Sequence, residues 1–373
     1  MSKSCNWIKL TVVNMLVLLT LLILCEIGLR VVWTGYQCYK DPCDFSAISK
    51  FRITDSNRIG FSETNIGITK YDPDLGYVPN PGFKGVIAEW NAKYVSIDEY
   101  GFRENISDDT RIKFDNNLKI LTVGASATFG DEVNNHETWS ACLEREIKQK
   151  VYNGGVFAYG AAQAIKRASL ETQVHNIDTL IYSIYLNSAF RRDKNIFRSG
   201  WPRPAVVSAN DEVEYAEVPP LTTRGIKYNP IKIQYPWLVT IFDHSMILTR
   251  VKKILQIDFT GMRRNEIHPD AATITEIINF AVSEFEKIDV RKKLIVFQYK
   301  KDNMYEKDRA SSEMQHIRDQ VLNLSKQKGI LVIDPYKSLY ASSKNTSKPV
   351  WTSHYTPLGN KIVCKEILKT IKK

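Results

Sequence analysis

The chain has 373 residues, of which 43% are hydrophobic, 11% aromatic and 25% charged. These values are typical of a globular protein and exclude a disordered chain. The formal net charge of +10 comes from 51 Lys and Arg against 41 Asp and Glu, scattered along the sequence. Because no basic arm or aromatic-interleaved basic patch is present, no nucleic-acid partner is expected. A solvated basic surface is the simplest interpretation, and a site for anionic lipid or acidic polysaccharide is the alternative.

An almost wholly apolar stretch begins at Leu10 and continues to residue 33. A helix of about 20 residues covers the roughly 30 Å hydrocarbon layer of a bilayer, so residues 10–33 are predicted to form a transmembrane anchor. Lys3 and Lys9 lie in residues 1–9, which are therefore expected in the cytoplasm, with the body on the far side of the membrane, periplasmic in a Gram-negative cell. A cleaved signal peptide is the alternative, although no A-x-A-like site follows the apolar stretch.

Residues 34–116 carry many turn formers and no long helical period, and the pattern predicts an irregular, β-rich lead-in. Cys38 and Cys43 lie just beyond the predicted anchor, where an oxidising compartment would allow a disulfide, and this pairing stays open. Cys142 and Cys364 lie among apolar residues of predicted helices and are expected to be buried free thiols.

From about residue 117 to 373, short apolar runs alternate with amphipathic segments, as in a parallel α/β sheet covered by helices. An insertion at about 190–272 is too long for a simple crossover, and a further helix is predicted near Ser245–Leu255. The predicted strands are Leu118–Val123, Val151–Val156, Thr179–Leu186, Leu294–Gln298 and Ile330–Ile333. The predicted helices cover about 137–150, 161–175, 273–288, 311–327 and 358–372.

Ligands of parallel sheets bind at the carboxyl ends of the strands, and this rule selects candidate site residues. The first strand ends in Val123-Gly-Ala-Ser-Ala-Thr-Phe-Gly130, which places Ser126 at the strand tip. Ser126 is either a nucleophile or a serine that caps the following helix. The second strand leads into Asn153-Gly-Gly-Val-Phe-Ala-Tyr-Gly160, and the third ends at Asn187, so possible oxyanion donors reach the same edge. His354 precedes the last helix and can act as a general base.

These residues resemble the SGNH (GDSL-type) hydrolases, in particular their single-span, membrane-anchored bacterial members. The block Gly124-Ala-Ser126 is similar to the family's Gly-Asp-Ser, and Asn153-Gly-Gly-Val-Phe-Ala158 is similar to Asn-x-Gly-x-x-Gly. Asn187 matches the asparagine of the third block, and His354 followed by Pro357-Leu-Gly359 matches the last block. The resemblance covers roughly residues 70–373, weakly through the insertion.

The lead-in strengthens the resemblance, because Tyr71-Asp-Pro-Asp-Leu-Gly-Tyr followed by Tyr100-Gly-Phe-Arg103 is similar to what anchored members carry before their first block. The family implies a three-layer, flavodoxin-like parallel sheet. It also implies Ser126 and His354 as catalytic residues, with an oxyanion hole formed by Ser126, Ala158 and Asn187.

Three positions depart from the family pattern. Ala125 and Ala158 replace an aspartate and a glycine, but each keeps a backbone N–H. Trp351 and Thr352 stand where the acid of the last block is expected, so the histidine lacks a carboxylate from its own loop. Another group, such as a backbone carbonyl or the Thr352 hydroxyl, is therefore expected to orient His354 if the site is active.

Two functional hypotheses follow. The leading one is an exported, membrane-anchored serine esterase or O-acyltransferase that acts on acyl groups of cell-envelope polysaccharide or glycolipid, with acetyl as the expected group and without a metal or other cofactor. The alternative, motivated by the three departures, is a non-catalytic envelope protein that keeps the fold as a glycan-binding or scaffold module.

Overall fold

The chain divides into two compact units, Met1–Ser56 with Ile226–Arg263 and Asn57–Gly225 with Arg264–Lys373. The structure is a computed structural model, and it describes residues 2–40, 68–87, 90, 93–105, 115–186, 189–195, 197–198, 201–209, 212–218, 247, 269–300, 312–345 and 349–371. The first unit contains helix α1, and the second contains every β-sheet of the described residues.

Helix α1 covers Ser2–Lys40, and within it Thr11–Leu29 is long and apolar enough to cross a membrane. The large apolar side chains that are described in this stretch are exposed. Such a surface is unfavourable in water and favours an apolar surrounding. The helix overlaps the predicted span at 10–33, and its length and composition fit either a membrane anchor or a signal sequence.

A five-stranded parallel sheet forms the centre of the second unit, in the order β13-β12-β7-β5-β6. Numbered along the chain, this order is 2-1-3-4-5 from one edge to the other, which is the flavodoxin-like arrangement. All five predicted strands are therefore confirmed, as β5 (Asp115–Gly124), β6 (Gln149–Gly155), β7 (Thr179–Tyr185), β12 (Lys292–Gln298) and β13 (Leu331–Ile333).

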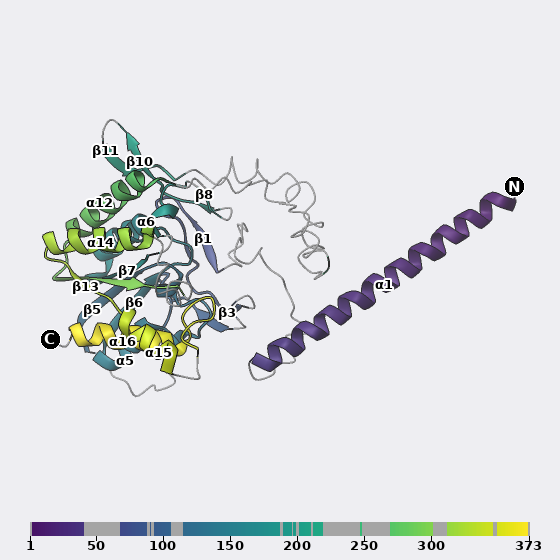
Figure 1. The fold of residues 1–373 in the computed structure, drawn as a ribbon, viewed down its shortest axis with the longest axis horizontal. Helices are drawn as coiled ribbons and strands as arrows, with labels where there is room; N and C mark the ends of the chain where they lie inside the picture. Colours follow the sequence, from purple (N-terminus) through teal and green to yellow (C-terminus); the bar gives the residue numbers. More distant parts are fainter. Residues whose placement is uncertain are drawn as a thin grey trace. The chain divides into compact units, whose positions relative to one another are not determined.

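Helices cover both faces of this sheet and complete three layers (Figure 1). Helices α6 and α14 contact α12 on one face, and α5 and α15 contact α16 on the other. The five helices predicted around the sheet are all present, and α15 is an additional one. The bounds are α5 (Trp139–Ile147), α6 (Ala161–His175), α12 (Ala271–Lys287), α14 (Ser312–Gln327), α15 (Tyr336–Asn345) and α16 (Pro357–Ile371).

Burial explains the helix pattern. In α12 six apolar residues recur at helical spacing and are buried, so the helix is held by its inner face. The helix begins after Asp270, whose carboxylate accepts the N–H of Thr273 at 2.8 Å. The buried residues of this face are Ile274, Ile277, Ile278, Ala281, Val282 and Phe285.

The lead-in contains two antiparallel hairpins, β1 (Thr69–Asp72) with β2 (Gly76–Pro79) and β3 (Lys84–Ile87) with β4 (Lys93–Ser96). Their inner residues, such as Tyr77, belong to the same hydrophobic core as the sheet. The lead-in is therefore packed into the body.

The insertion carries further short elements after the third strand of the sheet. They are α7 (Ala189–Arg192), β8 (Phe197–Arg198), β9 (Trp201–Pro202), β10 (Val206–Ala209) and β11 (Glu212–Tyr215). The helix predicted near 245–255 lies outside the described residues, apart from Ile247.

Cys142 and Cys364 form a disulfide, so the expectation of two free thiols is wrong. Both side chains are buried, as expected, but α5 and α16 pack against each other on one face of the sheet. This packing brings the two Cα atoms to 6.1 Å, within the range that a disulfide bridges. The pairing of Cys38 with Cys43 falls outside the description, because Cys43 is not among the described residues.

Candidate active site

Ser126 is the first residue of the short helix α4 (Ser126–Phe129), directly after β5. Ala125 holds the capping position of this helix, so the interpretation of Ser126 as an N-cap is wrong. The turn is possible because Gly155 on the neighbouring strand leaves space. A Cβ atom there would lie 2.3 Å from the backbone nitrogen of Phe129. The Ser126 side chain is buried at the carboxyl end of the sheet, where the strand pattern predicts it.

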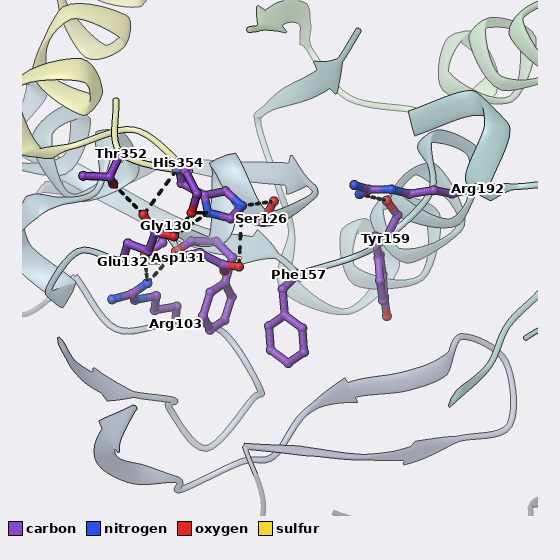
Figure 2. A network of polar contacts seen from close by, with 12 residues as sticks. Arg103, Ser126, Gly130, Asp131, Glu132, Phe157, Tyr159, Arg192, Thr352 and His354 are labelled. Carbon is purple, nitrogen blue, oxygen red and sulfur yellow. Dashed lines mark hydrogen bonds and ion pairs between the residues drawn. The ribbon is translucent and has the colours of Figure 1, made fainter. Parts of the chain in front are cut away.

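His354 lies in the loop before α16, and its Nε2 is 3.0 Å from the Ser126 Oγ (Figure 2). Two flanking aromatic residues tie this loop to the end of β12. The Trp351 indole donates to the carbonyl of Tyr299 at 3.2 Å, and the Tyr299 N–H donates to the Tyr355 hydroxyl at 2.8 Å. The loop is thus fixed on both sides of the histidine, at hydrogen-bonding distance from the serine.

A carboxylate lies on the other side of the imidazole. Glu132 Oε1 is 3.1 Å from His354 Nδ1, and Glu132 Oε2 accepts the His354 backbone N–H at 3.3 Å. The hydroxyls of Thr352 and Ser353 also donate to this carboxylate. Burial raises the pKa of the Glu132 carboxyl, but the hydrogen bonds from His354, Ser353 and Thr352 together hold it well below its usual range. Glu132 is therefore ionised at neutral pH.

This arrangement corrects the role expected for Thr352. Its hydroxyl donates to Glu132 Oε2 at 2.5 Å, so it supports the group that lies at Nδ1. Sequence reasoning missed Glu132 because it is 222 residues away from His354 and belongs to the turn after α4. The available signal was the acidic pair that directly follows the serine block, Asp131 and Glu132.

The turn that carries these carboxylates has an unusual backbone. Glu132 has a φ of 70°, in the left-handed region that non-glycine residues rarely adopt. Such conformations cost of order 1–3 kcal/mol and persist where the surroundings hold them, often at functional sites. The neighbouring Asp131 is buried, and its Oδ2 lies 3.8 Å from His354 Nε2. Two carboxylates therefore lie close to the imidazole.

Ala158 lies in the turn after β6, at the same edge of the sheet as Ser126. The Val156 N–H donates to the carbonyl of Gly124 at 3.0 Å, which joins the ends of the two strands. Ala158 has a φ of 63°, so it occupies a left-handed position at the site where the family pattern has glycine. Asn187, the other expected oxyanion donor, lies outside the described residues.

Two arginines hold the Ala158 turn, the buried Arg203 and the half-buried Arg192. Arg203 Nη2 donates to the carbonyl of Ala158 at 2.8 Å, and Arg192 Nη1 donates to that of Tyr159 at 3.1 Å. Both arginines come from the insertion, which therefore braces this turn. Among the residues that the structure describes, no group of three or more His, Cys, Asp and Glu side chains could hold a metal ion.

No protein-family model matches the chain, and no curated protein matches it. Among solved structures, it is similar to LAE5, an alpha/beta hydrolase enzyme from the metagenome of Lake Arreo, at 10% identity and a TM-score of 0.40, covering 70% of this chain and 98% of that one. It is also similar to a member of the lipolytic protein G-D-S-L family from Veillonella parvula, at 11% identity and a TM-score of 0.40, covering 69% and 99%.

A third similar structure is a catalytic mutant of Axe2, an acetylxylan esterase from Geobacillus stearothermophilus, at 14% identity and a TM-score of 0.40, covering 70% and 97%. At this level the comparison carries no argument about activity. The strand order and the helices on both faces give the described body a three-layer, flavodoxin-like α/β fold, with Ser126 directly after the first strand of the sheet.

Proposed function

We propose that the chain is a serine esterase or O-acyltransferase in which Ser126, His354 and Glu132 form a catalytic triad. One observation carries the proposal: Ser126 Oγ, the two imidazole nitrogens and Glu132 Oε1 form a continuous chain of contacts at 3.0 and 3.1 Å. Nucleophile, base and acid in this order constitute the arrangement of serine hydrolases, which is recognised by geometry.

In this mechanism the Ser126 Oγ attacks the acyl carbonyl carbon while its proton moves to His354 Nε2. The Glu132 carboxylate holds the Nδ1–H and stabilises the imidazolium that forms. The backbone N–H groups of Ser126 and Ala158, with the Asn187 side chain, are proposed to bind the oxyanion. As the tetrahedral intermediate collapses, the leaving alkoxide takes the proton from Nε2 and the acyl group stays on Ser126. Water or an acceptor hydroxyl, deprotonated by His354, then removes the acyl group.

The alternative function, a non-catalytic glycan-binding or scaffold module, rests on the three departures from the family pattern, of which the threonine at position 352 is the most serious. Glu132 at Nδ1 supplies the carboxylate that Thr352 lacks, so this departure no longer argues against catalysis. The alanines at 125 and 158 retain their backbone N–H groups and leave an oxyanion site chemically feasible.

Export of the body is supported by two features. The disulfide between Cys142 and Cys364 favours an oxidising compartment. Lys3 and Lys9 precede the apolar part of α1 and favour a cytoplasmic N-terminus. We therefore propose a membrane-anchored enzyme whose body lies outside the cytoplasm. It acts on acyl groups of cell-envelope glycan or glycolipid, and acetyl is the first candidate. The choice of substrate follows the family resemblance of the sequence blocks.

The catalytic proposal is tested by labelling the full-length, detergent-solubilised protein with a serine-reactive fluorophosphonate. The parent and Ser208→Ala, which changes an exposed serine of β10, should be labelled, whereas Ser126→Ala should not. Hydrolysis of an activated acetyl ester should follow the same pattern. A folded parent that is neither labelled nor active, or a label that persists in Ser126→Ala, rules out the proposed nucleophile.

The proposed topology is tested separately with a C-terminal reporter that is active only outside the cytoplasm. The fusion should be active, and it should remain with the membrane fraction after carbonate extraction. A stable but silent fusion would contradict export, and a soluble, shortened product would indicate a cleaved signal sequence.

A further inference from the structure

The acidic turn at Gly130–Val133 poses a structural question. The Glu132 side chain contacts His354 although the Glu132 backbone is in the left-handed region, with a φ of 70°. Such a conformation persists only where surrounding contacts hold it. The side-chain hydrogen bonds at Glu132 come from the histidine loop itself, so they cannot fix the turn independently of that loop.

Arg103 provides the independent contacts. Its guanidinium lies beneath the turn and donates to three carbonyls on both sides of Asp131 and Glu132 (Figure 2). The acceptors are the carbonyls of Phe129 at 2.9 Å, Gly130 at 2.6 Å and Val133 at 2.6 Å, with Asn135 Oδ1 at 3.1 Å from Nε. A planar guanidinium with a fixed fork of donors can hold several carbonyls in one geometry, which an ammonium group cannot.

Arg103 is itself held rigidly. It is 1% exposed, and its backbone bridges to Ile97 on one side and to Asn153 on the other. Its N–H donates to the Asn153 carbonyl at 3.0 Å, which joins it to β6 of the central sheet. Burial lowers the pKa of the guanidinium to about 9, while Asp131 and Glu137 act in the opposite direction, so the group stays charged at neutral pH.

We propose that Arg103 is a positioning residue of the active site, which sets the place of the Glu132 carboxylate against His354 by holding the carbonyls of its turn. The lead-in motif Tyr100-Gly-Phe-Arg103 then contributes to the geometry of the active site through its arginine. This inference deepens the proposed function and rests on it for the activity measurement, and a spectroscopic measurement tests it independently.

The first test is a double-mutant cycle on the full-length protein, with hydrolysis of an activated acetyl ester as the readout and Ser126→Ala as the blank. Because a misplacement of about 1 Å can cost 10²-fold, Arg103→Lys should lower kcat/KM on the order of 10²-fold in the parent. In a Glu132→Gln background it should cost less than about threefold, because the carboxylate that it positions is already gone.

Arg167→Lys is the matched control. Arg167 in α6 is equally buried, at 1%, and donates to the Gly101 carbonyl of the same lead-in at 2.9 Å. It should change kcat/KM by the same small factor in both backgrounds, below about threefold, as expected for independent sites. If Arg103→Lys costs the same factor in both backgrounds, or if Arg167→Lys behaves like it, Arg103 is only a structural residue and the proposal is wrong.

The second test does not need activity. In protein with ¹⁵N-labelled histidine, the Nδ1–H proton that His354 donates to Glu132 should give a far-downfield resonance that is absent in Glu132→Gln. This resonance should weaken or disappear in Arg103→Lys and stay in Arg167→Lys. An unchanged resonance in folded Arg103→Lys overturns the proposal. An inactive parent whose resonance is lost in Arg103→Lys would refute the proposed function and leave this inference standing.

Thermal unfolding checks that each variant is folded. Should Arg103→Lys fail to fold, Asn135→Ala takes its place in both tests, because it removes one acceptor of the same guanidinium and leaves the arginine present. It should lower kcat/KM and weaken the resonance in the same direction. Unchanged values of both would overturn the proposal.

Discussion

Two turns at the edge of the sheet have the same construction and different tasks. The turn after α4 carries Glu132 at φ 70°, and the turn after β6 carries Ala158 at φ 63°. Each places a non-glycine residue in a left-handed conformation, and each has a buried arginine donating to its carbonyls, Arg103 in the first and Arg203 in the second.

The two turns differ in what they contribute to the proposed chemistry. The first contributes a side chain, the carboxylate at His354 Nδ1, whereas the second contributes a backbone N–H. We therefore expect the acidic turn to depend on the identity of its residue, and the Ala158 turn to depend on its conformation. The following predictions test this contrast, beginning with the largest effect.

Glu132→Gln should lower kcat about 10³- to 10⁴-fold, because an amide can favour the wrong imidazole tautomer and cannot stabilise the imidazolium. The measurement is steady-state hydrolysis of an activated acetyl ester, and Glu146→Gln on the exposed side of α5 is the control that should leave the rate unchanged.

Thr352→Asp should also slow the reaction, since a second carboxylate beside Glu132 repels it. A faster Thr352→Asp variant would mean that Glu132 does not serve as the acid.

A disulfide connects the two helices that follow the acidic turn and the histidine loop. Helix α5 follows the turn and α16 follows the loop, and the bonded cysteines are 222 residues apart in the sequence. Replacing both Cys142 and Cys364 by serine should lower the free energy of unfolding by on the order of 4 kcal/mol, because the cross-link restricts a long loop of the unfolded chain. Urea unfolding measures this loss. A reducing agent should destabilise the parent and leave the double variant unchanged, and equal responses of both would contradict the prediction.

The Ala158 turn is connected to a buried titratable group instead. Asp193 accepts the N–H groups of Ala162 and Gln163, at 2.9 and 3.3 Å, at the start of α6. Burial raises its pKa to about 7, against the lowering effect of these N–H groups and of Arg203. The folded state therefore binds a proton at Asp193 more tightly than the unfolded state, in which the carboxyl has its ordinary pKa of 3.8.

The contribution of Asp193 to the free energy of unfolding is fully present below about pH 4. It is lost as the pH rises towards 7, at a rate of at most about 1.4 kcal/mol per pH unit. Urea unfolding between pH 4 and 8 measures the slope, and Asp193→Asn should be less pH-dependent than the parent over this window. Asp289→Asn, which changes an exposed aspartate, is the control and should leave the parent's slope intact. A parent whose stability rises with pH relative to Asp193→Asn would reverse the assigned direction.

The smallest effect concerns the backbone of the Ala158 turn. Ala158→Gly relieves a left-handed alanine, which costs roughly 1–2 kcal/mol, and this gain is offset by about 0.5–1 kcal/mol of additional chain entropy. Thermal unfolding should therefore show equal or slightly higher stability. Ala168→Gly inside α6 is the matched change and should be destabilising by about 1 kcal/mol. Equal losses in both variants would mean that Ala158 is not strained.

Much of the fold follows from local patterns in the sequence. Apolar runs and helical periodicity predicted the five strands and five helices of the sheet domain, because each element must turn an apolar face to the core. The rule that functional groups gather at the carboxyl ends of strands made Ser126 a candidate nucleophile, and the other groups expected at the same edge made His354 a candidate base; the structure brings the two to 3.0 Å.

Other features depend on which surfaces pack together, and local patterns do not contain this information. Glu132 is 222 residues from His354, and Cys142 is the same distance from Cys364. Arg103 reaches the acidic turn only because the lead-in folds into the core. Local patterns therefore predict the elements and the ends of strands from which chemistry could come. Packing selects which carboxylate faces the histidine, which cysteines meet and which arginine holds the turn, because each of these contacts joins side chains from separate elements.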